Sequence, residues 1–451
     1  MQTKINIIDP VSTEFNRGSF CYAPYLLYNG LKETGMYQIN LMESFITERL
    51  DDIPDADAHI VCLWSYPQID ACILLAHLLP MNTGKSNIYF IGYSSLIKEY
   101  GLPTAEEYFL IDLLSDPTFL KTAIIAYPKY YKDFTNLLLS DCDMHIKGLE
   151  KGEKVYPLFT SYGCPNGCTF CPSTVNCRRN RISLTSKETI ELLKECNRKG
   201  YRSIHFTDED FFFDLPRAYE VLSGISGMGF HLIALGSADA VYDFIQMYGT
   251  DVIKNAGLEV IEIGFESGDT DVSKSMGKGK SLSKCELLAQ GQDMYPFNIF
   301  WLVMTFYIGE TITSLNETGR FMQLYGFNPD DVVGRLRTNG TKGGLGQYFQ
   351  PYHGTGILKI VRNSGEFLPI SGARLIPTYI PNSFLDSEIR EISYEKLKDA
   401  SYWLSLYGVY DLVICIQVGK TVRELIKDLP TFQKQKAVIY MAILARMGVI
   451  C

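Results

Sequence analysis

Three cysteines that lie close together carry the clearest chemical signal in this sequence. Cys164, Cys168 and Cys171 occur in the segment SYGCPNGCTFCP (161–172) with the spacing CxxxCxxC. Thiolates are soft ligands that suit iron–sulfur clusters and zinc, and interleaved glycines let the backbone turn tightly around a cluster. Three thiolates on a four-iron cube leave one iron without a protein ligand, and an open position is typical of a catalytic metal site.

A zinc site and ordinary buried cysteines are the alternatives. Zinc knuckles usually pair two CxxC spacings, or add a fourth Cys or His at a matching distance. The nearest further cysteine is Cys177, and no histidine lies nearby. The spacing therefore favours a cluster loop.

The elements around this loop follow a strand–loop–helix order. Thr185 and Glu188 form a capping-box pattern that predicts a helix over Ser186–Asn197. Polar residues gather where the predicted strands end, which suits a partial (β/α) barrel with its active site at the C-terminal strand ends. The strands that we expect are Val155–Ser161, Ser203–Thr207, His231–Leu235, Val260–Phe265, Ile299–Tyr307 and Asp331–Leu336.

The cysteine spacing, with Phe170 before the third cysteine and acidic strand ends downstream, resembles the cluster loop of the radical S-adenosylmethionine (SAM) superfamily. The resemblance implies a [4Fe-4S] cluster held by the three cysteines, with SAM bound to the open iron. It also implies an electron donor such as flavodoxin or ferredoxin, and reductive cleavage of SAM to a 5′-deoxyadenosyl radical that removes a hydrogen atom from an unactivated carbon.

The same resemblance assigns SAM contacts to two acidic segments. In DEDFFFD (208–214), Asp208 and Glu209 are the candidates for the methionyl amine, because a cationic amine needs an acceptor. A solvated acidic turn is the alternative, which the flanking phenylalanines disfavour. In IGFESGDTDVSKSMGKG (263–279), the candidates are Glu266 and Ser267, while Lys278 is either a ligand of the SAM carboxylate or a surface lysine.

Two segments depart from the family pattern. Leu235-Gly236-Ser237-Ala238-Asp239 lacks the arginine that often follows the third strand, so its contact to SAM is replaced or missing. The late Pro-Tyr-Pro-Gly-Thr motif reads Pro351-Tyr352-His353-Gly354-Thr355. His353 is either an acid–base or substrate contact, since its reference pKa is about 6.5, or a loop substitution without a role.

Residues 1–150 read as alternating strands and helices with apolar strands, which predicts a doubly wound parallel sheet. Ligands on such sheets bind beyond the C-terminal strand ends, here Ser65 and Tyr66 after one strand and Gly92 and Tyr93 at the end of another. The strands that we expect are Ile5–Ile8, Tyr37–Leu41, Ala58–Trp64, Asn87–Gly92 and Thr122–Ala126, with helices over Tyr22–Thr34 and Ile69–Leu79.

A doubly wound unit directly before a radical SAM core resembles the cobalamin-binding domain of the cobalamin-dependent branch. The phrase DCDMHIKGLEKGEKVYPLFTSYGC (141–164) is similar to that branch's passage into the cluster strand. Asp57-Ala58-His59 matches the first part of the DxHxxG motif that supplies a histidine ligand to cobalamin, but Cys62 occupies the glycine position. We therefore expect no histidine ligand to cobalamin. A domain that binds nothing, or only substrate, is the alternative.

The C-terminal residues 361–451 predict a mostly helical cap that shapes substrate access, with amphipathic helices over Ile389–Leu406 and Gln433–Met447. The cap contains no further CxxC pair, so we expect no auxiliary cluster. The Gly-rich segment 338–347 lacks the spacing of a phosphate-binding loop and predicts a flexible loop over the barrel mouth. The fold class is thus α/β: a Rossmann-like cobalamin-binding-type domain (1–150), a partial (β/α)6 TIM barrel (151–360) and the cap.

Bulk composition limits the remaining choices. The chain has 451 residues, 46% hydrophobic and 21% charged, which describes a globular protein of two or three domains. A net charge of −9 argues against nucleic-acid binding. Twelve cysteines without a secretory signal indicate a reducing compartment. Apolar runs are too short to span a bilayer, so we expect a cytoplasmic protein.

These expectations combine into one function with alternatives. The first is a cobalamin-dependent radical SAM methyltransferase acting on a carbon of a small molecule or peptide. The second keeps the architecture but catalyses rearrangement, cyclisation or epimerisation, with Cys177 or Cys285 as a hydrogen-atom donor or, in the simpler interpretation, an inert thiol. A non-catalytic iron–sulfur protein and an RNA-modifying enzyme are the remaining alternatives. A non-catalytic iron–sulfur protein would leave the acidic strand ends unexplained.

Overall fold

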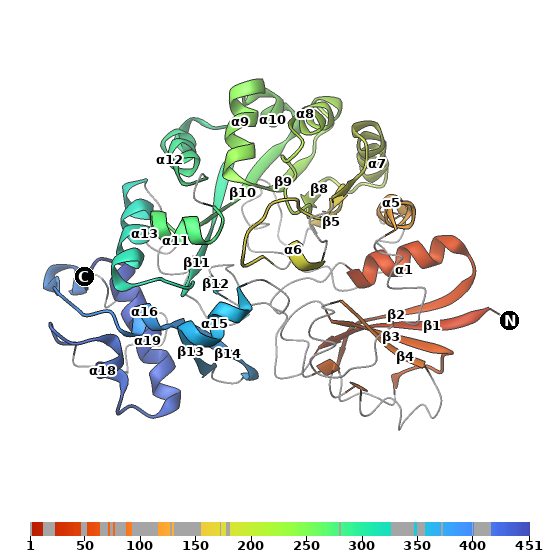
Figure 1. The fold of residues 1–451 in the computed structure, drawn as a ribbon. Coiled ribbons are helices and arrows are strands. Elements are labelled where there is room, and N and C mark those ends of the chain that lie inside the picture. The colour runs from red at the N-terminus through yellow and green to blue at the C-terminus, as the bar shows by residue number, and fades with distance from the viewer. Residues whose placement is uncertain are drawn as a thin grey trace.

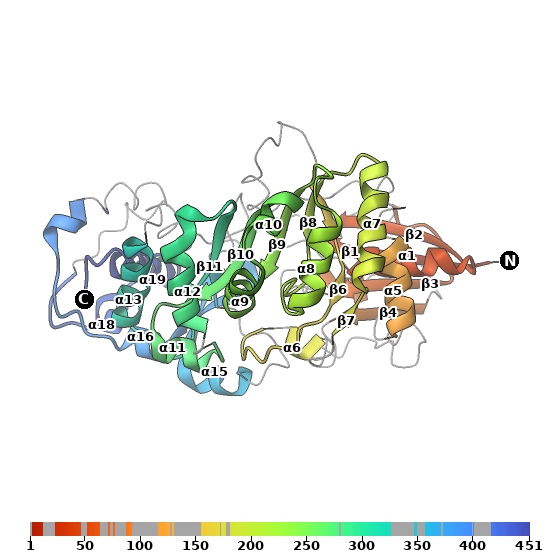
Figure 2. The ribbon, with the colours of Figure 1, turned by 90° about the horizontal axis from the view of Figure 1, so that it is seen from above.

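The structure of the protein is a computed structural model. It has two parallel sheets followed by a C-terminal unit, arranged along the long axis of the molecule (Figures 1 and 2). Among the described helices, none is both long and apolar enough to cross a bilayer. The residues that the structure describes are 2–11, 23–46, 52–63, 71–72, 75–76, 87–92, 116–126, 129, 155–171, 173–176, 181–278, 281–325, 347–349, 357–370, 373–398, 400 and 416–451.

The N-terminal sheet has four strands in the order β2-β1-β3-β4, and every described pairing is parallel. This order is that of a doubly wound flavodoxin-like sheet, as the alternating pattern predicts. Its strands run from the N-terminus toward the centre of the molecule (Figure 1). They are β1 (Thr3–Val11), β2 (Tyr37–Ile46), β3 (Ala58–Leu63) and β4 (Asn87–Gly92), with helix α1 (Ala23–Thr34) packed on one face.

The predicted strand Thr122–Ala126 is wrong, because this segment belongs to helix α5 (Pro117–Ala126). Asp116 Oδ1 accepts the backbone N–H groups of Thr118 and Phe119 at 2.7 and 3.1 Å, and proline is favoured at the first helical position. A five-residue apolar run does not distinguish strand from helix, whereas the Asp-Pro start signal does.

The second sheet is a six-stranded parallel half-barrel in the order β12-β11-β10-β9-β8-β5. Helices cover its outer side (Figure 1), which confirms the predicted partial barrel. The predicted strand Asp331–Leu336 lies outside the described residues, and the sixth strand is β12. The strands are β5 (Tyr156–Leu158), β8 (Ser203–Phe206), β9 (His231–Gly236), β10 (Leu258–Glu266), β11 (Asn298–Thr305) and β12 (Gln347–Tyr348).

Sequence-local signals fix the barrel helices. Thr185 and Glu188 form the predicted capping box of α7, and Asp214, Ser237 and Thr311 cap α8, α9 and α13. The helices are α6 (Ser173–Asn176), α7 (Ser186–Arg198), α8 (Leu215–Gly224), α9 (Ala238–Tyr248), α10 (Asp251–Ala256), α11 (Thr270–Ser275), α12 (Ser281–Gly291) and α13 (Ile312–Leu324).

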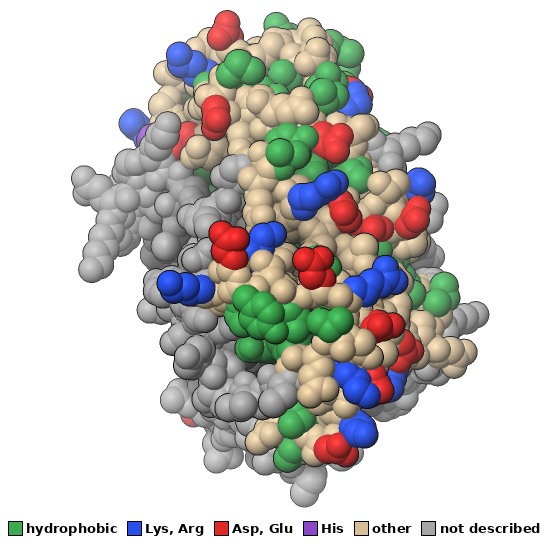
Figure 3. Space-filling model, turned by 90° about the vertical axis from the view of Figure 1, so that its left-hand side faces the viewer, with side chains coloured by type: hydrophobic (Ala, Val, Ile, Leu, Met, Phe, Trp, Pro, Cys, Tyr) green, Lys and Arg blue, Asp and Glu red, His purple; other side chains and the backbone are tan. Residues whose placement is uncertain are grey.

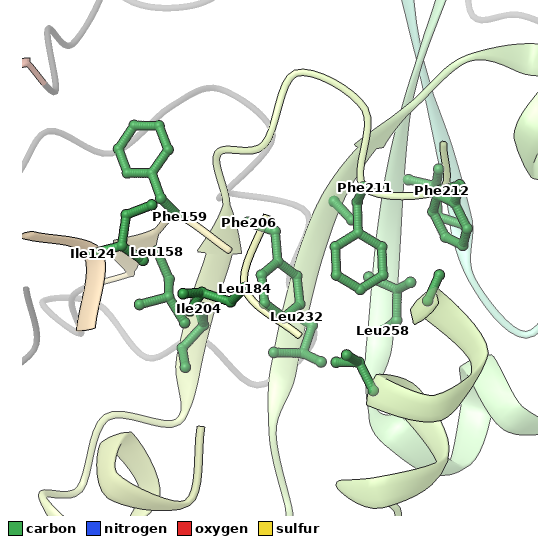
Figure 4. Close-up of a cluster of buried hydrophobic side chains, with 14 of the residues drawn as sticks. Ile124, Leu158, Phe159, Leu184, Ile204, Phe206, Phe211, Phe212, Leu232 and Leu258 are labelled. Carbon is green, nitrogen blue, oxygen red and sulfur yellow. The ribbon is translucent and has the colours of Figure 1, made fainter. Parts of the chain in front are cut away.

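One hydrophobic core joins the N-terminal sheet to the half-barrel. Ile124 of α5 lies beside Leu158 and Phe159 of the first barrel strand and its loop (Figure 4). The same cluster continues through Phe206 and Phe211, whose ring centroids are 4.6 Å apart. Because interiors are close-packed, this shared core fixes the position of one sheet relative to the other.

The C-terminal unit is mixed rather than purely helical. A hairpin of β13 (Gly365–Ile370) and β14 (Ala373–Pro381) precedes its helices, and the sequence analysis missed it. The predicted helix over Gln433–Met447 is confirmed as α19. Of the predicted helix over Ile389–Leu406, residues 389–393 are not helical, residues 394–398 and 400 are helical, and the remaining positions lie outside the described residues. The helices are α15 (Leu358–Ser364), α16 (Asn382–Leu385), α18 (Val422–Ile426) and α19 (Thr431–Arg446).

Helix α19 docks tightly on the barrel. A Cβ on Gly319 of α13 would lie 1.9 Å from the Arg446 carbonyl oxygen, so the two helices touch through a glycine. The buried Arg446 donates to the Met304 carbonyl at 2.9 Å and to Thr305 Oγ1 at 2.6 Å. The C-terminal unit therefore reaches the end of β11. On the face shown in Figure 3, acidic and basic side chains are interspersed around hydrophobic patches.

Candidate functional site

Three free thiols lie on a loop whose ends are held by a short hairpin. β6 (Ser161–Tyr162) and β7 (Ile182–Ser183) pair antiparallel on either side of the loop. Cys164, Cys168 and Cys171 are half-buried. The Cys171 N–H donates to the Cys168 carbonyl at 3.2 Å, so these two residues share one turn. The loop presents three soft donors from one short segment.

The surroundings of these thiols disfavour the free thiolate. Burial raises the pKa of Cys164 to about 11 and also raises the pKa of Cys168 and Cys171. The nearby Lys278 ammonium acts in the opposite direction on the pKa of Cys168 and Cys171. Because the thiolate is the metal-binding form, these donors need positive charge close by.

Within the described ranges, no three His, Cys, Asp or Glu side chains converge closely enough to hold a single metal ion. Thiolates that bind separate irons of a cluster need not converge on one point. The donor set, three cysteines without an accompanying histidine, suits an iron–sulfur cluster.

Asp208 holds the entrance to the cysteine loop. Its Oδ1 accepts the backbone N–H groups of Thr160 and Ser161 at 2.6 and 3.0 Å, and its Oδ2 accepts their hydroxyls at 2.6 and 2.8 Å. A carboxylate has about four lone-pair sites, and these four bonds occupy them. The fully buried side chain of Asp208 thus ties β8 to the segment between β5 and β6, and its contact to SAM stays a prediction.

Glu209 is one of the acids close to the cysteines, together with Asp210 and Glu266. Its Oε2 accepts the N–H of Gly163 at 2.9 Å, and its charge raises the pKa of Cys164 and Cys171. Burial, reinforced by Asp208, raises the pKa of Glu209 to about 7. A cation placed beside this poorly solvated carboxyl group would stabilise its ionised form.

Lys278 and Glu266 form an ion pair close to the cysteine loop. Lys278 Nζ lies 3.1 Å from Glu266 Oε1 and donates to the Gly264 carbonyl at 3.0 Å. Only 16% and 12% of the two side-chain surfaces are exposed, which excludes the surface-lysine alternative. Burial acts to lower the pKa of Lys278, but Glu266 and Cys168 raise it above its ordinary value, so Lys278 stays charged.

Backbone irregularity directs Glu266 toward this pair. The register between β10 and β11 shifts between Gly264 and Glu266, and Glu266 has a φ of 66°. Bulges next to active sites re-aim a side chain, and positive φ at a non-glycine residue is uncommon. A Cβ on Gly264 would lie 2.4 Å from Lys278 Nζ and 2.8 Å from Glu266 Oε1, so glycine makes room for the pair.

Phe170 lies against the same lysine. Lys278 Nζ is 5.8 Å from the Phe170 ring centroid, within the range of a cation–π contact. Ser267, in contrast, faces away: its Oγ accepts the N–H of Asp269 at 3.2 Å and lies 3.4 Å from Thr318 Oγ1 of α13. Ser267 thus fixes the turn into α11, and its contact to SAM stays a prediction.

The remaining predicted residues lie either at the ends of described strands or outside the described residues. Gly92 is the last residue of β4. The segment after β9 caps α9 through Ser237. The predicted residues that lie outside the described part of the chain are Ser65, Tyr66, Tyr93, Cys177 and His353.

Two features of the site were missed by the sequence analysis. Arg181, just before β7, donates from Nη1 to the Asp210 carbonyl at 2.7 Å and lowers the pKa of Glu209; only its position beside the hairpin could have indicated it. In the N-terminal sheet, the order β2-β1-β3-β4 puts the topological switch point between β1 and β3. His59 is the second residue of β3 and therefore lies away from the C-terminal ends of these strands.

Cys285 of α12 is also close to the Lys278–Glu266 pair. Burial raises its pKa to about 12, and Lys278 acts in the opposite direction. Its side chain is 1% exposed, which favours an inert thiol over a hydrogen-atom donor that must reach substrate.

Comparisons with solved structures agree with the fold. The radical SAM methyltransferase TsrM from Kitasatospora setae, with tryptophan and a SAM analogue bound, has a TM-score of 0.51 at 11% identity, covering 72% of this chain and 71% of that chain. The cobalamin-dependent SAM radical enzyme OxsB has a TM-score of 0.55 at 16% identity, covering 90% of this chain and 67% of that chain. At these identities the likeness establishes the fold.

Sequence comparison adds a curated relative and a family. A bacteriochlorophyllide d C-12(1)-methyltransferase from Chlorobaculum tepidum is 28% identical over 136 residues, covering 29% of each chain. The chain therefore matches less than a third of the length of this relative. Residues 158–322 match the radical SAM superfamily, and this span contains the cysteine loop, Glu209, Glu266 and Lys278. The matched span covers less than half of the chain, and over this span the chain is similar to the radical SAM superfamily.

Proposed function

We propose that the protein is a cobalamin-dependent radical SAM enzyme that methylates an unactivated carbon of a small molecule or peptide. The observation that carries this proposal is the arrangement around the cysteine loop. Three free thiols lie close to Glu209, which accepts from the loop at Gly163, and to the Lys278–Glu266 pair, at the C-terminal ends of parallel strands. Barrel active sites form at these ends.

The residues fit the cofactors of the family. Cys164, Cys168 and Cys171 would hold a [4Fe-4S] cluster, for which half-buried thiols on one short loop are suitable donors. Bound there and reduced, the cluster would supply one electron, which would cleave SAM to methionine and a 5′-deoxyadenosyl radical. The cluster also supplies the positive charge that these buried thiols need in order to ionise.

Charged groups of the chain would position SAM. Glu209, with its pKa raised to about 7 by burial, would become ionised when it accepts from the methionyl ammonium. Lys278 would bind the methionyl carboxylate while Glu266 keeps it charged and oriented. Phe170 covers one side of Lys278 and limits its access to water. Lys278 would thus supply the cation that the missing arginine after β9 does not.

The N-terminal sheet would bind cobalamin beyond its C-terminal strand ends, where a doubly wound sheet binds its ligand. The likeness to TsrM and OxsB, whose solved structures include cobalamin-bound forms, supports this part of the proposal. Ser65, Tyr66, Gly92 and Tyr93 remain the predicted contacts. A histidine ligand is not expected: burial lowers the pKa of His59, and Nδ1 of its buried ring lies 3.2 Å from the Asn6 side-chain amide.

A second candidate is a non-methylating radical reaction in the same architecture. It is supported by one observation: the cobalamin-dependent SAM radical enzyme OxsB matches 90% of this chain, whereas the methyltransferase TsrM matches 72%.

The test is anaerobic reconstitution with iron, sulfide, SAM and a reductant, with and without cobalamin. We expect 5′-deoxyadenosine to form and corrinoid absorbance to remain with the purified protein. Cys168→Ala should abolish 5′-deoxyadenosine formation, whereas Cys196→Ala, a buried thiol on α7, should retain it. Absence of 5′-deoxyadenosine from a protein with a full cluster would refute the radical SAM assignment, and absence of corrinoid would refute the cobalamin part alone.

A further inference from the structure

A tyrosine outside the predicted site holds the middle of the cysteine loop. Tyr307, two residues after β11, has its hydroxyl 2.7 Å from Thr169 Oγ1, between Cys168 and Phe170. One of these hydroxyls donates to the other, and each lies 3.2 Å from the Ser275 carbonyl oxygen, which accepts from the hydroxyl whose proton remains. The Tyr307 side chain is 1% exposed, so these bonds replace water contacts that the buried hydroxyl has lost.

The backbone of the loop is held at the same place. The N–H of Thr169 donates to the Met276 carbonyl at 3.1 Å, and Gly277 lies so close that a Cβ there would be 3.3 Å from the Gly167 carbonyl. The two residues that follow α11, Met276 and Gly277, therefore pack directly against the loop, and Lys278 comes next in the chain. A shift of Thr169 would move both Cys168 and the Lys278 side chain.

An aromatic chain connects this contact to the C-terminal hairpin. The Tyr307 ring lies 6.3 Å from Phe170 and 4.9 Å from Phe349, and Phe349 lies 5.6 Å from Tyr379 of β14. The Tyr379 hydroxyl bonds to Ser364 Oγ at 2.9 Å, away from the cysteine loop. The two tyrosines thus share one aromatic chain but bond to different parts of the molecule.

We propose that Tyr307 is a positioning residue for the cluster: through Thr169 it fixes the Cys168–Cys171 turn, and so sets the retention and electronic environment of the bound cluster. This inference rests on the proposed function, because it requires a cluster on the three cysteines. Tyr307 is not required to contact SAM or substrate. Hydrogen bonding around cluster ligands is one of the influences that tune such sites.

The experiment compares Tyr307→Phe with Tyr379→Phe in the reconstituted full-length protein. Each removes one hydroxyl and keeps its ring. We expect cluster loss to a ferrous chelator to be about fivefold faster in Tyr307→Phe, as the loss of a hydrogen bond of about 1 kcal/mol implies, with a changed EPR spectrum of the reduced cluster. Tyr379→Phe should match the parent in both measurements.

Variants at Thr169 separate positioning from general destabilisation. Thr169→Val should reproduce Tyr307→Phe, Thr169→Ser should restore parental behaviour, and the Thr169→Val/Tyr307→Phe double variant should be no worse than either single one. A parental chelation rate and EPR spectrum in Tyr307→Phe would overturn the inference while leaving the proposed function intact. Failure of the parent to take up iron and sulfide would overturn both.

Discussion

Removal of the Lys278 ammonium is the sharpest test of how the site is built. Lys278→Met keeps most of the side-chain stem but leaves Glu266 as a buried carboxylate without its partner at 3.1 Å. Breaking a buried pair costs about 3 to 5 kcal/mol. Because 12% of the Glu266 side chain still reaches solvent, we expect the lower end, about 3 kcal/mol of unfolding free energy.

Lys194→Met is the matched control. Lys194 also pairs with a glutamate, Glu191, at 2.8 Å, but the two side chains are 45% and 60% exposed. Exposed pairs contribute about 0 to 1 kcal/mol. Urea unfolding of the cofactor-free protein should therefore separate the two variants by about 2 kcal/mol or more.

The double variant identifies the cause. In Lys278→Met/Glu266→Gln the uncompensated charge is gone, so part of the loss should be recovered, although Gln cannot restore the ion pair. Equal unfolding free energies for Lys278→Met and Lys194→Met would refute the argument that this pair is buried and coupled. In the reconstituted protein, Lys278→Met should also weaken SAM binding at least tenfold, or about 1.4 kcal/mol, whereas Lys194→Met should leave it unchanged.

Three further predictions test other parts of the structure. Asp208→Asn replaces an acceptor of four buried bonds; we expect a loss of about 3 kcal/mol in urea unfolding and reduced iron uptake. Burial raises the pKa of Glu310 to about 7, so the folded state binds the extra proton and stability falls as pH rises toward 7; Glu310→Gln should flatten this slope in thermal melts between pH 5 and 8. Gly319→Ala forces a Cβ to within 1.9 Å of the Arg446 carbonyl, and a melting curve should show a loss of about 1 to 3 kcal/mol; unchanged melting would contradict the tight α13–α19 contact.

The sequence predicted elements well where a local signal marks their ends. The capping box at Thr185 fixed the start of α7, and apolar runs marked the parallel strands. Thr122–Ala126 failed because its apolar run suits either state and the Asp-Pro signal upstream was not used. The hairpin of β13 and β14 has few local markers, and its pairing is a tertiary property.

In the candidate site, too, the residues with a local sequence signal were predicted and those placed by tertiary structure were not. Residue type and spacing indicate the cysteines, because soft donors at short spacing have few other uses. They do not distinguish Asp208 from Glu209, which are neighbours in one acidic run. Their difference comes from geometry: Asp208 points back to Thr160 and Ser161, while Glu209 faces the cysteine loop. Tyr307 gave no signal at all, because its partner Thr169 is 138 positions away.

The shared hydrophobic core fixes the position of the N-terminal sheet relative to the half-barrel, and so limits how a chemical group could be transferred between ligands bound to the two sheets. Ile124 of the N-terminal part packs with Leu158 and Phe159 at the start of the barrel (Figure 4), and Lys121 lies 3.8 Å from Glu188 at the first turn of α7. Burying such apolar surface contributes about 25 cal/mol per Å², and a hinge opening at this contact would lose that contribution. Ligands bound at the C-terminal edges of the two sheets would therefore keep a fixed relation, and substrate access would depend on the loops that follow the strands.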